Sequence, residues 1–157
     1  MISGESRPTR CVMGRLEAGE EVVAALRELA RFERIDAGFV RAQGAVQAAE
    51  LARYDAGARG YVPACGVPGA AELVSLQGNV SLEDGVPGVR LWAVLAVPPA
   101  EGGPGGPEDA PAVRAGMLVR ARSSYVEFAI DVYDDGDLER RADVATGLAL
   151  WRPPRRR

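Results

Sequence analysis

Two residue types are missing from this 157-residue chain, and their absence removes whole classes of chemistry. There is no histidine, which excludes a Ser-His-Asp triad, a Cys-His nucleophile pair, a HExxH metal site and an imidazole general base. There is also no lysine, because all 19 cationic side chains are arginine. Neither Schiff-base chemistry nor a P-loop lysine is therefore available. We assign no catalytic residue, and the composition favours a binding protein over an enzyme.

Cysteines and long apolar runs are also scarce. Cys11 and Cys65 are the only cysteines, and two cysteines without histidine cannot close a structural zinc site. We expect two reduced thiols in a cytoplasmic protein, with no metal and no cofactor. No apolar run approaches the roughly 18–20 residues of a membrane helix, so we expect no membrane partner.

Charge is distributed unevenly along the chain. The net charge is −3, yet four arginines fall within the last six residues: Arg152, Arg155, Arg156 and Arg157. The rest of the chain is therefore more acidic than the whole, and it should repel nucleic acid. The tail, with two prolines beside these arginines, is the candidate nucleic-acid-binding segment, since arginines on an extended arm can enter a minor groove.

Hydrophobic periodicity predicts an α+β domain with one main amphipathic helix and a largely antiparallel sheet of about seven strands. The helix is predicted over residues 19–34, because its apolar residues recur at helical spacing. Strands are predicted over 11–16, 39–46, 48–54, 60–62, 73–80, 89–97, 113–121 and 126–132, with loops over 63–70 and 98–112. Gly44 indicates a bulge or a close backbone approach, and a change of parity predicts a bulge or bend at residues 122–124. One helix covers one face of a sheet, so we expect self-association to cover the remainder.

Several segments, taken in order, resemble the plant and prokaryote conserved (PPC) domain. They are Gly19–Val23, Ala37–Val40, Gly44–Val46, the E-L-V-S-L-Q-G-N-V segment at 72–80, 89–96, 115–119 and 126–127. The resemblance covers roughly residues 10–133. It implies a homotrimer with a sheet-plus-helix fold, and a family whose plant members accompany AT-hooks in DNA-binding proteins.

The resemblance also identifies a departure from the family. Many bacterial members carry H-x-H in the central strand and G-H-L in the next one, and these histidines can form a metal site. The corresponding residues here are Arg90, Trp92 and Met117, none of which is a zinc ligand. Two interpretations stay open: a repacked site with Arg90 in a salt bridge, or a pocket for an anionic ligand. The candidate ligand-binding residues are Arg90, Trp92, Met117, Glu72, Gln77 and Glu127.

The predicted organisation is an N-terminal extension over residues 1–9, a PPC-like domain over 10–133 that contains the 98–112 loop, and a C-terminal extension over 134–157. The leading hypothesis is a non-enzymatic, homotrimeric module for interaction with macromolecules, either DNA through the tail or another protein. The alternative is a protein or enzyme that binds a small anionic molecule in a pocket around Arg90, Trp92 and Met117.

Overall fold

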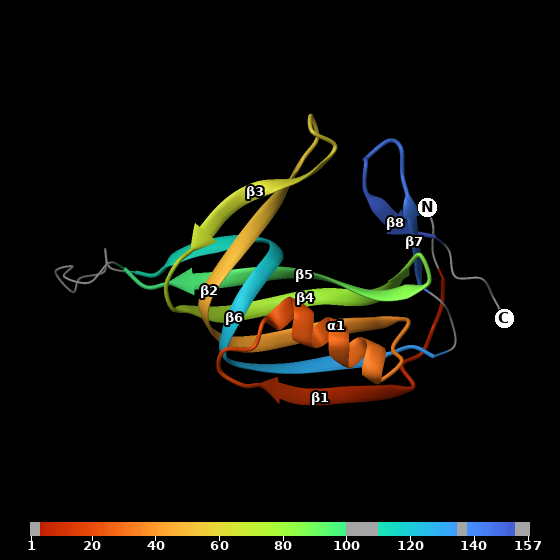
Figure 1. The fold of residues 1–157 in the computed structure, drawn as a ribbon, viewed down its shortest axis with the longest axis horizontal. Helices are drawn as coiled ribbons and strands as arrows, with labels where there is room; N and C mark the ends of the chain where they lie inside the picture. Colours follow the sequence, from red (N-terminus) through yellow and green to blue (C-terminus); the bar gives the residue numbers. More distant parts are fainter. Residues whose placement is uncertain (1–3, 100–109, 135–137, 153–157) are drawn as a thin grey trace.

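The structure, a computed structural model, describes residues 4–99, 110–134 and 138–152 (Figure 1). Its element order is β1 (Arg10–Leu16), α1 (Val22–Phe32), β2 (Gly38–Asp55), β3 (Gly60–Val67), β4 (Ala71–Glu83), β5 (Val86–Val97), β6 (Ala112–Val132), β7 (Glu139–Ala142) and β8 (Ala149–Trp151). The predicted fold class, a largely antiparallel sheet with one amphipathic helix, is confirmed. Among the described residues there is no helix long and apolar enough to cross a membrane.

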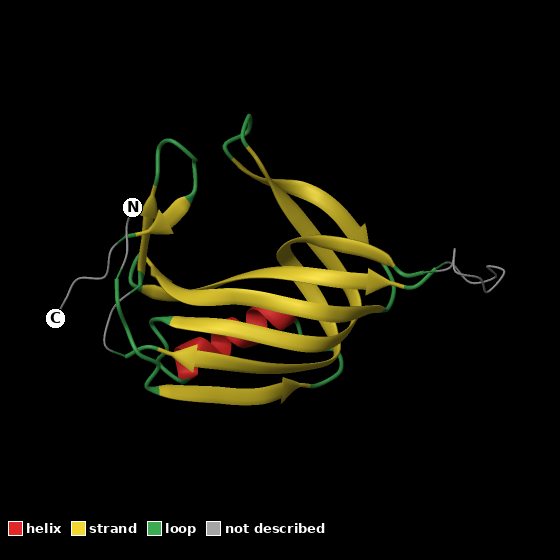
Figure 2. Cartoon of the chain, turned by 180° about the vertical axis from the view of Figure 1, so that it is seen from behind, coloured by secondary structure: helices red, strands yellow, loops and turns green. Residues whose placement is uncertain are grey.

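Two long strands, β2 and β6, organise the sheet because the two halves of each strand pair with different neighbours. The first half of β2 lies between β4 and the second half of β6, whereas its second half lies between β3 and the first half of β6. β5 joins β4 to the first half of β6, and β1 pairs with the second half of β6. The sheet thus curves back on itself through β2, β4, β5 and β6, as Figure 2 shows from behind.

The sequence divided each of these long strands into two, and the structure corrects that division. The irregularities predicted at Gly44 and at residues 122–124 exist as bulges, and the strands continue through them. The register of β2 against β4 shifts between Ala42 and Gly44, and β6 shifts against β2 beside Ser123 and Tyr125. A bulge adds a residue and bends a strand without ending it. The predicted loop over 63–70 is also wrong at its start, because β3 continues to Val67.

Gly44 makes both the bulge and the close backbone approach that the sequence predicts. Its φ is +147°, and a Cβ atom at this position would lie 2.2 Å from the carbonyl oxygen of Tyr125. A residue with a side chain would push β2 away from β6 at this point. Glycine is therefore required where the two long strands come closest.

The helix α1 is shorter than predicted and begins at a carboxylate cap. Glu21 accepts hydrogen bonds from the backbone N–H groups of Val23 (3.3 Å) and Ala24 (2.7 Å), so it precedes the helix and does not lie in its first turn. It also accepts one from the N–H of Ala121 at 3.0 Å, which ties the start of α1 to β6. A carboxylate at this end satisfies free N–H groups and complements the helix dipole.

The core lies between α1 and one face of the curved sheet. Helix residues Val22, Leu26 and Ala30 are fully buried there, and α1 packs against β5 and β6. Along β5 the buried apolar residues alternate with Arg90, Trp92 and Val94, which point to the other side of the sheet. We call this second side, the one away from α1, the outer face.

The C-terminal extension contains structure that the sequence analysis missed. β7 and β8 form an antiparallel hairpin, and β7 runs parallel to the end of β4 through Leu82–Glu139 and Glu83–Arg140 (Figure 1). This is the one parallel pairing among the described strands, although short connections predicted antiparallel pairs. The hairpin was missed because β7 and β8 have only four and three residues, too few to show a period.

Candidate functional site

The sheet brings three of the six predicted ligand-binding residues into one row on the outer face. Gln77 on β4 lies opposite Trp92 on β5, and Trp92 lies opposite Met117 on β6. Trp92 is 40% exposed, and Met117 is half-buried. The predicted proximity of Trp92 and Met117 therefore follows from the strand register.

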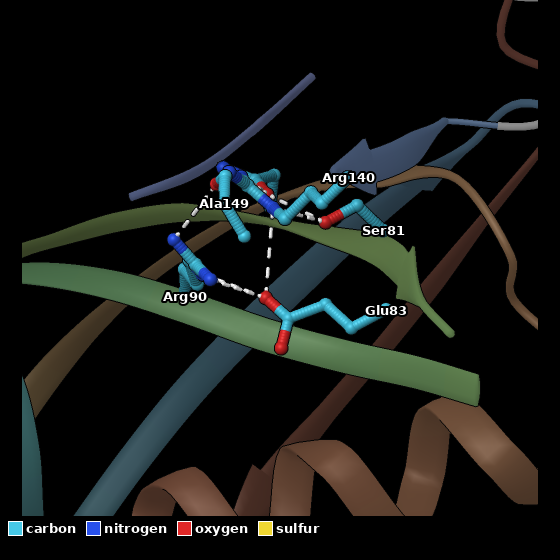
Figure 3. Close-up of polar contacts among 6 residues, drawn as sticks. Ser81, Glu83, Arg90, Arg140 and Ala149 are labelled. Carbon is cyan, nitrogen blue, oxygen red and sulfur yellow. Dashed lines mark hydrogen bonds and ion pairs between the residues drawn. The ribbon is translucent and has the colours of Figure 1, made fainter. Parts of the chain in front are cut away.

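Arg90 lies in the neighbouring row, but its guanidinium is engaged with its own fold (Figure 3). Its Nε donates to Glu83 at 2.8 Å, its Nη2 lies 2.5 Å from the same carboxylate, and its Nη1 donates to the carbonyl of Ala149 at 3.1 Å. These contacts correspond to the salt-bridge interpretation of the sequence analysis. They leave Arg90 few free donors for an incoming anion.

A second arginine, Arg140 from β7, completes this cluster, and the sequence analysis gave no signal for it. Its guanidinium donates to Ser81 Oγ (2.7 Å), Asn79 Oδ1 (2.7 Å) and the carbonyl of Ala149 (3.0 Å). It also lies 5.4 Å from the ring centroid of Trp151, a cation–π contact. These contacts fasten the β7–β8 hairpin to β4.

The charge on Arg140 is costly in this environment. Its side chain is only 6% exposed, and burial, together with repulsion from Arg90, lowers its pKa to about 10. Glu83, 3.9 Å from Arg140, acts in the opposite direction. Two guanidinium groups thus share one carboxylate, and the neutral oxygens that accept from Arg140 must offset the loss of water.

A groove of about 510 Å³ opens on the outer face between β2, β4 and β5. Its lining residues are Phe39, Val40, Arg41, Gln77, Gly78, Asn79 and Trp92. Gln77 and Trp92 are thus the predicted residues that line it. The sequence analysis missed Phe39 and Arg41, although their alternation with buried Val40 in β2 was the available signal.

The remaining predicted ligand-binding residues, Glu72 and Glu127, do not line the groove. Glu72 is exposed on β4 opposite Ala96 and Ala45, near the other end of the strand. Glu127 is exposed on β6, opposite Gln43 and Arg15.

The groove contains one charged side chain, and that charge is paired. Arg41 forms a two-pronged ion pair with Asp131 on β6, one contact of which, from Nη2 to Oδ1, measures 3.2 Å. Arg41 lowers the pKa of Asp131. Besides this paired charge, the polar side chains that line the groove are the carboxamides of Gln77 and Asn79.

Phe39 forms one wall of the groove, and aromatic rings from two later elements support it. The ring of Tyr133, just after β6, and the ring of Trp151 on β8 each contact Phe39 edge-on, with centroids 5.8 Å away. Edge-to-face geometry at this distance is favourable for aromatic rings. The C-terminal hairpin thus supports the groove twice, through Trp151 against Phe39 and through Arg140 against Asn79.

Of the four predicted nucleic-acid-binding arginines, the structure describes one. Arg152 is exposed directly after β8, and its backbone N–H donates to the carbonyl of Glu139 at 2.8 Å. Arg155, Arg156 and Arg157 lie outside the described residues.

The curved sheet with one helix is shared with a known family of domains. Residues 3–106 match the Plants and Prokaryotes Conserved (PCC) domain, and the chain belongs to that family, which is the PPC family of the sequence analysis. No protein among the curated sequences matches the chain.

Solved structures share the fold over nearly the whole chain. A metal-containing protein of Archaeoglobus fulgidus is 28% identical, with a TM-score of 0.82 over 96% of this chain and 99% of that one. A PPC protein of Pyrococcus horikoshii is 26% identical, with a TM-score of 0.81 over 96% of both chains. A candidate DNA-binding protein of Bacteroides thetaiotaomicron is 18% identical, with a TM-score of 0.76 over 92% of this chain and 93% of that one.

We predict that this chain binds no stoichiometric zinc, although one of its relatives contains metal. Arg90, Trp92 and Met117 stand where the resemblance implies histidine, and the described residues hold no cluster of three His, Cys, Asp or Glu side chains. Elemental analysis after dialysis should find far less than one zinc per chain. About one retained zinc per chain would contradict the prediction.

We also predict that Arg140→Met loosens the β7–β8 hairpin. The change removes the donor of Asn79 and Ser81 and the cation over Trp151, so the free energy of unfolding should fall by about 1–3 kcal/mol. Amide hydrogen exchange over residues 139–151 should accelerate at least about tenfold.

Arg141→Met is the matched control for this experiment. Arg141 is half-exposed and pairs with Glu139 at 2.8 Å, so its loss should change the stability by no more than about 0.5 kcal/mol. Equal exchange rates in the two variants would show that Arg140 does not hold the hairpin.

Proposed function

We propose that this chain is a non-enzymatic module that acts as a homotrimer and associates with other macromolecules, DNA among them. The observation that carries the proposal is an apolar patch on the face of the sheet away from α1. The patch consists of Val74, Val94 and Val113 on the adjacent strands β4, β5 and β6, which are 51%, 36% and 65% exposed.

Self-association is the economical way to cover this patch. The helix already covers the inner face, and among the described residues the β7–β8 hairpin docks at the other end of β4. A ring of three copies with cyclic symmetry would bury the same patch on every subunit. The family resemblance supports three copies. The small size of the patch on one subunit is compatible with such sharing.

DNA association is assigned to the tail because it gathers four arginines in six residues, whereas several arginines of the described sheet are paired with carboxylates. Arg15, Arg41, Arg53 and Arg120 each pair with a carboxylate on the sheet or beside it. The four tail arginines follow the last strand of an otherwise acidic chain. Two structural relatives described as candidate DNA-binding proteins support this direction. The preference should be no finer than A·T over G·C, since the minor-groove pattern is degenerate.

Val94→Arg should convert the trimer to a monomer. A guanidinium cannot be buried unpaired in an apolar contact between copies. Size-exclusion chromatography with light scattering should give about three times the 16.6 kDa chain mass for the unmodified protein and a single chain mass for the variant.

Val144→Arg is the control, because Val144 is 86% exposed in the turn between β7 and β8. This variant should remain trimeric. An unmodified protein that is monomeric at micromolar concentration would overturn the trimer.

Replacing Arg155, Arg156 and Arg157 with glutamine should weaken duplex binding and flatten its salt dependence. Each phosphate that the tail no longer neutralises should reduce the slope of log K against log salt by about 0.9. These changes are preferable to a truncation after Leu150. Such a truncation would remove Trp151, which pairs with Arg140 and contacts Phe39, and would therefore disturb the fold as well as the charge.

The control for charge replaces Arg27, Arg31 and Arg34, three exposed arginines in and just after α1, with glutamine. It changes the net charge equally and should leave duplex affinity nearly unaltered. If both triple variants bind alike, the tail is not the DNA-binding element. If the unmodified protein fails to bind even at low salt, DNA association drops out of the proposal.

A further inference from the structure

Two exposed aromatic rings face the groove from opposite sides. Phe39 on β2 and Trp92 on β5 are 46% and 40% exposed, and β4 runs between their strands. Phe39 lies opposite Asn79, whereas Trp92 lies opposite Gln77, two residues away on β4. Ordinary strand spacing then separates the two Cα atoms by about 10 Å across the strands and about 7 Å along them.

This separation suits one flat ring. A ring stacked against two others needs about 7–8 Å between them, because each contact between carbon atoms takes about 3.5–4.0 Å. The two rings, which both line the groove, therefore leave between them a space that one or two fused rings would fill. A hydrated ion would leave the exposed ring faces without a stacking partner, and an aliphatic chain would leave the carboxamides of the groove without hydrogen-bond partners.

The polar part of the groove consists of carboxamides. Gln77 and Asn79 each offer one acceptor oxygen and two N–H donors in a plane. The Oδ1 atom of Asn79 accepts from Arg140 at 2.7 Å, which fixes the orientation of that amide, whereas Gln77 is exposed. A planar amide matches a planar edge that carries a donor beside an acceptor.

The charge of the groove disfavours an anion. Its one charged lining residue, Arg41, is paired with Asp131, and Arg90 is engaged by Glu83 outside the lining. A phosphate or carboxylate would have to compete with these carboxylates. A neutral ring would not.

Residues outside the groove also hold two of its lining residues, Phe39 and Asn79, in position. Tyr133 and Trp151 fix the ring of Phe39, and Arg140 fixes Asn79. Groups whose side chains are already positioned lose less conformational freedom when a ligand binds. The C-terminal hairpin thereby positions residues of the groove in addition to extending the sheet.

We propose that this groove binds an unpaired purine base, with adenine as the best fit. The ring would stack between Phe39 and Trp92, and the amide of Gln77 would bind the N6 and N7 atoms, which is the pairing that Asn and Gln make with adenine. The base belongs either to a free nucleoside or to a single-stranded nucleic acid, since both present the same ring. The inference requires neither the basic tail nor the trimer, so it goes beyond the proposed function.

The test is calorimetric titration of the full chain with adenosine, followed in parallel by tryptophan fluorescence. We expect saturable binding of one adenosine per chain, with quenching, and no binding of ribose. Gln77→Ala and Phe39→Ala should each weaken binding about tenfold or more. Gln47→Ala, which removes an exposed glutamine of β2 that does not line the groove, should leave the affinity unchanged.

Two further ligands sharpen the result. The analogue 7-deazaadenosine lacks the N7 acceptor and should bind about tenfold more weakly than adenosine. A single-stranded ten-nucleotide oligo(dA) distinguishes the sources: affinity per site equal to that of adenosine assigns a free nucleoside, and affinity at least about tenfold higher assigns a single strand.

Three results would overturn the proposal. They are no saturable binding of either adenosine or the oligonucleotide at millimolar concentration, equal affinities for Gln77→Ala and Gln47→Ala, or equal affinities for adenosine and 7-deazaadenosine. The variant with glutamine at 155–157 should retain adenosine binding. Loss of duplex binding in that variant therefore leaves the groove independently testable.

Discussion

The close approach of β2 to β6 at Gly44 is the constraint on which the rest of the structure depends. With no side chain in the way, the two strands stay paired across a bulge and continue for 18 and 21 residues. Because each strand is that long and bent, it can pair with different neighbours along its two halves. The curved sheet follows from this double pairing, and its two faces differ because α1 covers one of them and side chains alternate along each strand.

The inner and outer faces of the sheet have different roles. The inner face buries leucine and valine against α1 and supplies the stability of the fold. The outer face is free of that task, so it carries amides, ion pairs and exposed aromatic rings in the same rows of side chains. Strand alternation places Arg90, Trp92 and Val94 there together, yet they differ in what they do. Arg90 is tied to the hairpin, Trp92 borders the groove and Val94 belongs to the apolar patch.

Much of the fold could be predicted because its signals are local. The hydrophobic period of α1 identified the helix, and the lone glycine in β2 indicated the bulge. Strand lengths could not be predicted, because a bulge within a strand and the end of a strand give the same interruption of the alternating pattern. The candidate site was predicted only in part for a related reason. Gln77, Trp92 and Met117 are adjacent by register, but Arg140 reaches Asn79 and Ser81 from a four-residue strand whose place depends on a parallel pairing. Phe39 and Arg41 were missed because nothing in β2 alone shows which strand will lie beside it.

Trp151 lies between the groove and the C-terminal tail, and its position brings the two close together. This residue touches Phe39 at the wall of the groove, and the proline–arginine tail begins at the next residue, Arg152. A polymer captured by the tail would therefore be tethered beside the groove by a very short connection. Short tethers give local concentrations in the millimolar range, so even a groove with millimolar intrinsic affinity would be substantially occupied. Weak recognition at one place can in this way be converted into productive recognition by attachment at another.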